Sequence, residues 1–177
     1  MVSVCDGKGK SNIITIGWAG TICTNPPMVS ISVRPERYSY DMLKETGEFV
    51  INLTTKELAW ATDYCGVKSG RDVHKWKEMR LTPVPSEQVK APCIAESPVN
   101  IECRVVRTQQ LGSHDMFLAD VVNVLVDEEY IDPDSGKLDL QRAELITYSH
   151  GEYFRLGEVI DHFGWSVRKK PKTKRRK

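Results

Sequence analysis

The stretch SNIITIGWAGTICTNPPMVSISVRPERYSYDMLKETGEFVINL, from Ser11 to Leu53, holds the pattern that decides the fold. Two runs rich in β-branched residues, NIITIGWAG and MVSISVRP, are separated by the breaker TNPP and predict neighbouring strands. The segment from Tyr38 to Thr46 has helical spacing and stops at Gly47, after which EFVINL predicts a further strand. We therefore expect a sheet into which a short helix is inserted.

Downstream of this stretch the pattern becomes helical and then polar. Thr54 or Thr55 can cap a helix that runs from Lys56 to about Tyr64 and ends at Gly66. The polar region from residue 68 to residue 98 contains four prolines, so it is predicted to be a long loop with one helical turn near residues 73–79. Loops of this length in compact domains are often functional, which makes it a candidate part of a site.

Alternation of apolar and polar residues returns at Asn100 and continues on both sides of the turn GSHD, which predicts a long hairpin. The N-terminal residues 1–4 predict a short apolar strand, and the segment after residue 144 is aromatic and irregular. Several strands with short helices between them, and no βαβ rhythm, indicate a mainly β, antiparallel barrel.

The bulk composition fits one soluble domain. The chain has 177 residues, enough for a single core, and contains no apolar run long enough to cross a membrane. The first residues lack the features of a secretory signal, so we expect a cytoplasmic protein without membrane contact. Five widely spaced cysteines lack zinc-site spacing and predict neither a disulfide framework nor a metal site.

The near-zero net charge hides a strong asymmetry. Residues 168–177 hold eight of the 25 basic residues, so the remaining chain carries 17 basic residues against 24 acidic ones. An acidic body is a poor generic binder of polyanions, which makes a nucleic-acid partner unlikely unless the tail alone supplies it. We expect the tail to be solvated and disordered, with an adaptor role for acidic partners as the alternative.

Familiar catalytic motifs are missing from the sequence. The hydrolase pattern G-x-S-x-G, the zinc pattern H-E-x-x-H, the phosphate loop G-x-x-x-x-G-K-[ST] and a G-x-G-x-x-G after a strand do not occur. These absences argue against common hydrolases, nucleoside triphosphatases and Rossmann dehydrogenases.

The remaining polar residues suit a flat, anionic ligand. Arg34, Arg37 and Ser39 fall between a strand and a helix, where free backbone N–H groups and the helix dipole favour a phosphate. Lys75 could add a cation from the long loop, and Trp18 an aromatic face. From the residues alone the alternative stays open, with Trp18 in the core, Arg37 and Lys75 solvated, and Ser39 a simple helix cap.

Three separated blocks of the sequence resemble those of a known protein family. The opening stretch, GRDVHKW (residues 70–76) and LGSHDMFLADV (residues 111–121) occur in the order found in the flavin reductase-like FMN-binding domain, and the chain most closely resembles its flavoredoxin branch. The resemblance covers residues 1–165 and leaves residues 166–177 as the basic tail. It implies an antiparallel six-stranded split β-barrel, usually a homodimer, with FMN in a groove near the subunit interface.

The same resemblance assigns roles to the residues around the flavin ring. It implies that Asn12 and Trp18 contact the ring and ribityl region, and that backbone groups of Ala19, Gly20 and Thr21 lie along the polar edge of the ring. Tyr153 or Phe154 is expected to cover the cofactor.

Further roles concern the phosphate and the nicotinamide. The resemblance implies that Arg37, Tyr38, Ser39 and Lys75 surround the phosphate of FMN. His114 matches a histidine beside the flavin and nicotinamide and is the candidate catalytic residue, with a solvent-exposed turn histidine as its alternative.

The resemblance also implies an activity. Family members are flavin oxidoreductases, in which a hydride passes from NADH or NADPH to N5 of the flavin, and the protein supplies position and electrostatics. A non-enzymatic FMN carrier or sensor is the alternative function. Met1 falls inside the first expected strand, whereas a further segment often precedes it in the family, so we expect a shortened chain or a misassigned start, with an incomplete first strand.

Overall fold

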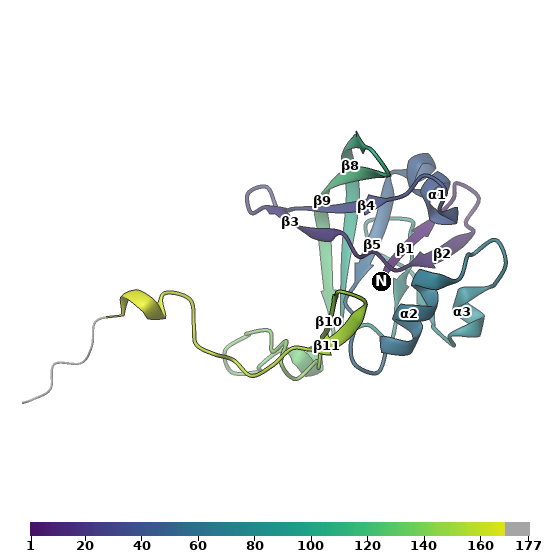
Figure 1. Cartoon of the computed structure of the whole chain (residues 1–177). Coiled ribbons are helices and arrows are strands. Elements are labelled where there is room, and N and C mark those ends of the chain that lie inside the picture. Colours follow the sequence, from purple (N-terminus) through teal and green to yellow (C-terminus); the bar gives the residue numbers. More distant parts are fainter. Residues whose placement is uncertain (169–177) are drawn as a thin grey trace, which may run out of the picture.

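The computed structural model describes residues 1–168, and its centre is one antiparallel sheet of seven strands (Figure 1). The order across the sheet is β2-β1-β5-β8-β9-β4-β3. The strands are β1 (Val2–Cys5), β2 (Ser11–Ile14), β3 (Ala19–Cys23), β4 (Met28–Val33), β5 (Glu48–Asn52), β8 (Val99–Leu111) and β9 (His114–Val126).

The connection between β2 and β3 forces this sheet to close. These two strands are consecutive in sequence, yet they form opposite edges of the sheet. A flat sheet of this width would separate its edges by about 29 Å at 4.8 Å per strand pair. The link through residues 15–18 spans at most about 19 Å, at 3.8 Å per Cα step. The sheet must therefore curl until its edges approach without pairing, which is a split barrel.

The expected class, mainly β and antiparallel with a split barrel, is confirmed, but the strand count is seven and not six. The run NIITIGWAG, predicted as one strand, divides into β2 and β3. The division coincides with a long-range contact, in which the hydroxyl of Thr15 donates a hydrogen bond to the carbonyl of Thr62.

The helix α1 (Tyr38–Thr46) has the bounds that the sequence predicted. Its end at Gly47 is explained by the backbone, since Gly47 has φ 65° and its N–H donates to the carbonyl of Leu43. The predicted helical turn in the long loop is α3 (Lys75–Glu78). That loop also contains the two short strands β6 (Pro83–Val84) and β7 (Cys93–Ile94), which pair with each other.

The helix α2 (Ala59–Val67) differs from its prediction at both ends. It starts three residues late, although the hydroxyl of Thr55 accepts a hydrogen bond from the N–H of Leu58 just before it. It also continues through Gly66, which was expected to end it. A Cβ at Gly66 would lie 3.2 Å from the Cβ of Thr15, so glycine here permits close packing of α2 on the β2–β3 link and does not act as a stop.

The barrel interior holds the main core, in which Phe49, Ile31 and Phe117 are completely or almost completely buried. A second cluster, which includes Trp76 and Ile94, lies under α2 and α3. Within residues 1–168 all five cysteines are free, and four of them are buried.

The C-terminal region starts with the turn η1 (Glu128–Tyr130) and the hairpin of β10 (Ile146–Ser149) and β11 (Glu152–Arg155). Beyond Leu156 the chain leaves the body as an extended arm that contains the turn η2 (Trp165–Val167), as Figure 1 shows. The expectation of a disordered basic tail concerns mainly residues 169–177, which lie outside the described part. Within residues 1–168, no helix is long and apolar enough to cross a membrane.

Candidate functional site

A cavity of about 350 Å³ lies where β2, the start of α1 and the segment between α2 and α3 meet. Its walls contain Asn12, Arg37, Tyr38, Ser39 and Lys75, which the sequence analysis placed around one ligand. The complete lining is Asn12, Ile14, Arg34, Glu36, Arg37, Tyr38, Ser39, Cys65, Gly66, Lys68, Ser69, Gly70, Arg71 and Lys75.

The N-terminus of α1 forms one wall of this cavity. Arg37 is the residue that precedes the helix, and its side chain makes no capping hydrogen bond. Ser39 is buried in the first turn, and its Oγ accepts a hydrogen bond of 2.8 Å from Nδ2 of Asn12 on β2. The reading of Ser39 as a simple helix cap is therefore wrong. Uncapped N–H groups and the positive end of the helix dipole favour an anion at this wall.

Lys75, the first residue of α3, supplies a buried cation to the same cavity. Its side chain is 3% exposed, which rules out the solvated alternative. Nζ donates hydrogen bonds of 2.7 Å to the carbonyls of Ile13 and Cys65. Since an ammonium has three N–H donors, one remains for a ligand.

The burial of Lys75 also changes its acidity. Desolvation lowers the pKa of Lys75 to about 8, and the nearby guanidinium of Arg37 acts in the same direction. The side chain therefore stays mainly protonated at neutral pH but titrates in the mildly alkaline range. A bound anion would restore the stability of the charged form.

Arg71 is a cavity residue that the sequence analysis did not single out. Its Nη1 donates a hydrogen bond of 3.0 Å to the carbonyl of Glu36, and its guanidinium lies 5.4 Å from the centre of the Tyr38 ring. The ammonium of Lys10 lies 5.1 Å from the same ring. The two cations hold Tyr38 by cation–π attraction at the cavity rim. The signal was available in the block GRDVHKW, of which only Lys75 was selected.

Gly70 is a second residue that was not selected, and its role is steric. A Cβ at this position would lie 2.4 Å from Oδ1 of Asn12 and 2.6 Å from Cδ1 of Tyr38. Real Cβ atoms do not approach other heavy atoms this closely, so a side chain here would displace at least one of these two groups. Glycine at position 70 therefore lets the loop close over Asn12 and Tyr38.

The charges around the cavity strongly favour an anionic ligand. Five cationic side chains line it against one carboxylate, that of Glu36, which pairs with Arg34 at 3.1 Å. A larger cavity, of about 420 Å³, has the opposite character, because its walls contain Glu57, Glu78 and Glu96 against a single arginine. Size alone would select the acidic cavity, but charge selects the basic one as the place for a phosphate.

Apart from Asn12, the residues expected around the flavin ring lie outside the basic cavity. Trp18 is 70% exposed in the link before β3. Ala19, Gly20 and Thr21 form the start of β3, which pairs with β4 on one side and is a sheet edge on the other. Trp18 is thus not a core residue. An edge strand presents alternate backbone N–H and C=O groups outward, and these could meet the polar rim of a ring.

The remaining candidates are also separate from the cavity. His114 is not a turn residue, because it is the first residue of β9, and its Nδ1 shares a hydrogen bond of 2.9 Å with the hydroxyl of Ser113. Its role beside flavin and nicotinamide stays a prediction. On β11, Tyr153 donates a hydrogen bond of 3.2 Å to Asp63 of α2, whereas Phe154 is exposed.

Comparisons with known proteins identify the family of this chain. A family model described as the flavin reductase like domain matches residues 1–157. A protein from Archaeoglobus fulgidus is 31% identical over 151 residues, which cover 85% of this chain and 84% of that protein. The flavoredoxin of Desulfovibrio vulgaris (Miyazaki F) superimposes with a TM-score of 0.88 and 30% identity, over 94% of this chain and 90% of that one.

A second flavoredoxin, from Methanosarcina acetivorans, superimposes with a TM-score of 0.81 and 28% identity, again over 94% of this chain and 90% of that one. The matched residues 1–157 include all seven strands of the barrel and the whole basic cavity. The chain therefore belongs to the flavin reductase-like family, and its split barrel is similar in structure to those of these two flavoredoxins.

Proposed function

We propose that this protein binds FMN, with the phosphate in the basic cavity, and acts as a flavin oxidoreductase that takes electrons from NADH or NADPH. The observation that carries the proposal is the convergence of the buried ammonium of Lys75 and the uncapped start of α1 on one cavity. A buried cation without a counter-ion lowers stability, so its presence is best explained by an anionic ligand.

The donor set fits a phosphate monoester. Lys75 offers one remaining N–H, Ser39 a hydroxyl, and the first turn of α1 its backbone N–H groups, all within one lining. Arg37 and Arg71 add charge at the rim. The ring of FMN would then lie toward Trp18 and the edge of β3, where an exposed aromatic side chain and outward backbone groups are available.

When bound, FMN would supply the redox chemistry, accepting a hydride at N5 of its ring. The residues of this chain have the simpler tasks of holding the phosphate, orienting the ring and leaving one ring face accessible. Backbone donors on the β3 edge would stabilise negative charge on the reduced ring. Such a reaction requires no side-chain base, which agrees with the absence of a catalytic motif from the sequence. Free flavin, oxygen, ferric chelates or a protein could then take the electrons.

Anaerobic mixing tests the proposal. The FMN-loaded protein is combined with NADH and, separately, with NADPH, while absorbance at the flavin maximum is followed. Rapid bleaching with either nucleotide supports the oxidoreductase. Persistent colour with both would leave a protein that binds FMN as a carrier or sensor, and a protein that binds no FMN would overturn the proposal as a whole.

Removal of the buried cation should specifically weaken binding of the phosphate group of FMN. We predict that Lys75→Met and Ser39→Ala each weaken FMN binding by about 1.5–3 kcal/mol, the usual worth of a hydrogen bond to a charged group. Binding of riboflavin, which lacks the phosphate, should change much less. Isothermal titration with both ligands measures the difference.

The matched control is Lys77→Met, which removes an exposed lysine from the same short helix. It should leave both dissociation constants unchanged. Equal losses for FMN and riboflavin in the Lys75 variant would place the phosphate elsewhere.

The acidity of Lys75 predicts a pH dependence. Because the pKa of Lys75 is lowered to about 8, the cation is lost as the pH rises above that value. The FMN dissociation constant should therefore be flat between pH 7 and 8 and then rise, by at most about tenfold per pH unit. Fluorescence titration from pH 7 to pH 9.5 measures it, and the slope should vanish in Lys75→Met while it persists in Lys77→Met.

A single methyl group should disturb the cavity at Gly70. We predict that Gly70→Ala weakens FMN binding at least roughly tenfold, because its Cβ would displace Asn12 or Tyr38. Gly157→Ala is the matched control, since its Cβ would meet nothing within 4 Å. Unchanged FMN affinity in a correctly folded Gly70→Ala protein would show that the closure of this loop does not shape the site.

A further inference from the structure

Two hydrogen bonds leave one free position on the side-chain nitrogen of Lys75. Nζ donates to the carbonyls of Ile13 and Cys65 at 2.7 Å each. In the protonated form the remaining position carries a third N–H, whereas in the neutral form it carries the lone pair, because both remaining N–H groups are already donated. Lys75 lines the basic cavity, so this free position is the one that a molecule in the cavity can reach.

The neutral form of Lys75 is present near neutral pH. Desolvation lowers the pKa of Lys75 to about 8, and the charged or titratable groups that act on it are the thiol of Cys65 and the guanidinium of Arg37. At pH 7.5 about a quarter of this amine is neutral, against about one in a thousand for a lysine of ordinary pKa. Lysines made nucleophilic by burial owe their reactivity to this change.

The thiol of Cys65 also lines the basic cavity, but its acidity changes in the other direction. Burial raises the pKa of the Cys65 thiol above its ordinary value of 9.0, against the opposing effect of the Lys75 ammonium. The amine of Lys75 therefore loses its proton at a lower pH than the thiol does. Since a thiol reacts as its thiolate, the amine is the more reactive of these two groups at neutral pH.

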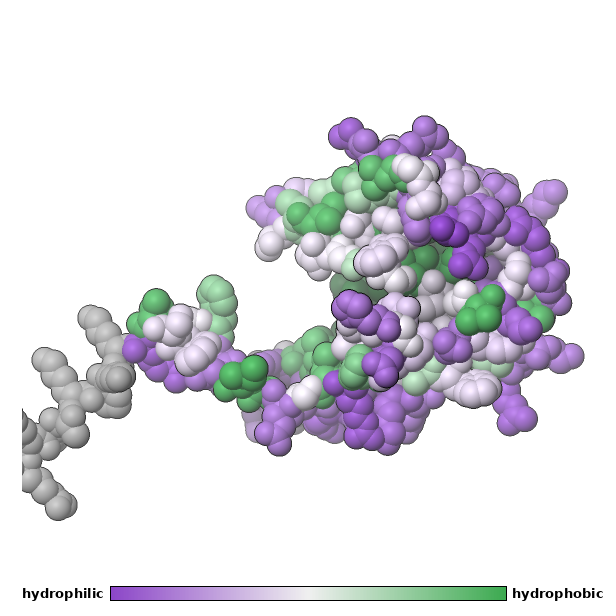
Figure 2. Space-filling view, in the orientation of Figure 1, coloured by the Kyte–Doolittle hydropathy of each residue, from purple (hydrophilic) through white to green (hydrophobic). Residues whose placement is uncertain are grey.

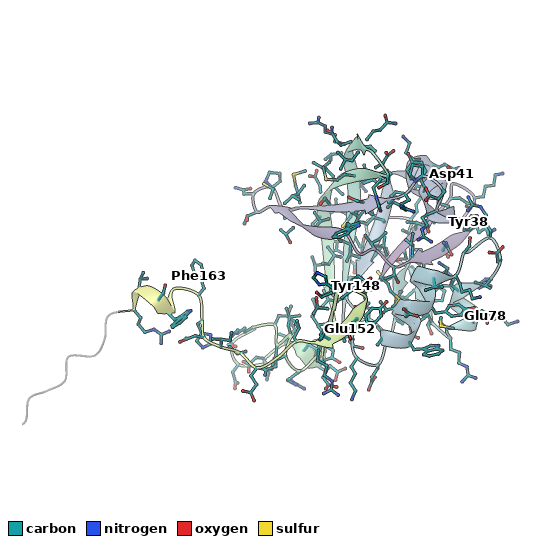
Figure 3. All side chains as sticks on the ribbon, in the orientation of Figure 1. Tyr38, Asp41, Glu78, Tyr148, Glu152 and Phe163 are labelled. Atoms are coloured by element: carbon teal, nitrogen blue, oxygen red, sulfur yellow. The ribbon has the colours of Figure 1, made fainter. Side chains whose placement is uncertain are left out.

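The position of the basic cavity suits a small hydrophilic molecule. In Figure 3, Tyr38 at the start of α1 and Glu78 at the end of α3 lie on the same side of the molecule. Figure 2 shows hydrophilic residues along most of the outer edge of this side. The volume of about 350 Å³ falls at the lower end of the range for small-molecule sites, roughly 300–1,000 Å³. The cations around the cavity select an anion.

A small acyl phosphate fits both the charge of the cavity and the nucleophile in its wall. In this mixed anhydride of a carboxylic acid and phosphate, one oxygen atom joins the anionic phosphate to an electrophilic carbonyl carbon. Ser39, Arg37 and the uncapped N–H groups of α1 can hold the phosphate without help from Nζ. A phosphate held there would bring the carbonyl carbon toward the free position on Nζ, because Lys75 lines the same cavity.

We propose that Lys75 is a modification site for small acyl phosphates, which bind by their phosphate in the basic cavity and transfer the acyl group to Nζ. The lone pair of Nζ forms a bond to the carbonyl carbon, and the bond from that carbon to the phosphate oxygen breaks. One amine proton passes to the departing phosphate. The products are an amide at Lys75 and hydrogen phosphate.

The modification would remove the buried cation of the cavity. An amide is neutral and has one N–H, so it can donate to only one of the two carbonyls of Ile13 and Cys65. The acyl group would also occupy space in the cavity. The acylation itself rests on the geometry of Lys75, and only its consequence, the loss of FMN binding, rests on the proposed function.

Labelling of the flavin-free full chain with acetyl phosphate at pH 7.5 tests the proposal. Peptide mass spectrometry measures the rate of acetylation at each lysine. We expect Lys75 to react at least roughly tenfold faster than Lys77, an exposed lysine of the same helix, because a far larger fraction of the buried amine is neutral. Excess inorganic phosphate should slow the reaction at Lys75 and leave that at Lys77 unchanged.

Acetic anhydride is the matched reagent, because it transfers the same acyl group without a phosphate. The ratio of the Lys75 rate to the Lys77 rate should be several-fold smaller with acetic anhydride than with acetyl phosphate. Acetylation of Lys75 no faster than that of Lys77, no protection of Lys75 by phosphate, or equal ratios with the two reagents would each overturn the proposal. These measurements use the native chain, so they do not depend on the folding of a variant.

A second measurement tests the consequence for FMN. We expect protein acetylated at Lys75 to bind FMN at least roughly tenfold more weakly than untreated protein, since a charge-assisted hydrogen bond is lost. Lys75→Gln, which imitates the neutral amide, should show a similar loss, and Lys77→Gln should show none. A chain that binds no FMN but acetylates selectively at Lys75 would refute the proposed function and leave the modification site standing, so the two proposals fail separately.

Discussion

The short link of residues 15–18 between opposite edges of the sheet is the constraint on which the structure depends. It closes the barrel, because no flat sheet of seven strands has edges near enough to be joined by it. It also directs Thr15 toward α2, and the missing side chain at Gly66 allows α2 to pack against it. The helix pair α2 and α3 is thereby held beside β2. Because Nζ of Lys75 donates to the carbonyl of Ile13 on β2, this position of α3 brings the ammonium to the same cavity as the start of α1.

Local sequence patterns predicted the elements well where neighbouring residues determine them. The helix α1 ends where a glycine adopts a left-handed conformation, and the β8–β9 hairpin follows simple alternation. The division of NIITIGWAG could not be predicted, because it depends on Thr15 meeting a helix 47 residues later in the chain. Gly66 was misread for the same reason. A glycine that permits close packing has the same sequence signature as one that stops a helix.

The candidate site was predicted from the sequence in part. Arg37, Ser39 and Lys75 were selected by residue type and position, and the structure brings them to one cavity. The burial of Lys75, which makes it the strongest argument for an anion, could not be seen in a polar loop sequence. The buried position of its ammonium depends on hydrogen bonds to the carbonyls of Ile13 on β2 and Cys65 on α2. Conversely, Trp18 and His114 were selected on the same resemblance, and the structure places both outside the cavity.

The buried ammonium of Lys75 makes the stability of the ligand-free protein depend on pH in the direction opposite to that of phosphate binding. In the unfolded chain Lys75 titrates near its ordinary value of 10.5, and in the folded chain at about 8. Between these values the unfolded chain binds more protons, so the free energy of unfolding of the empty protein rises with pH across that window. The strain of confining the charge is fully present below pH 8 and disappears above pH 10.5. Mild alkali thus stabilises the ligand-free fold while it weakens the binding of a phosphate.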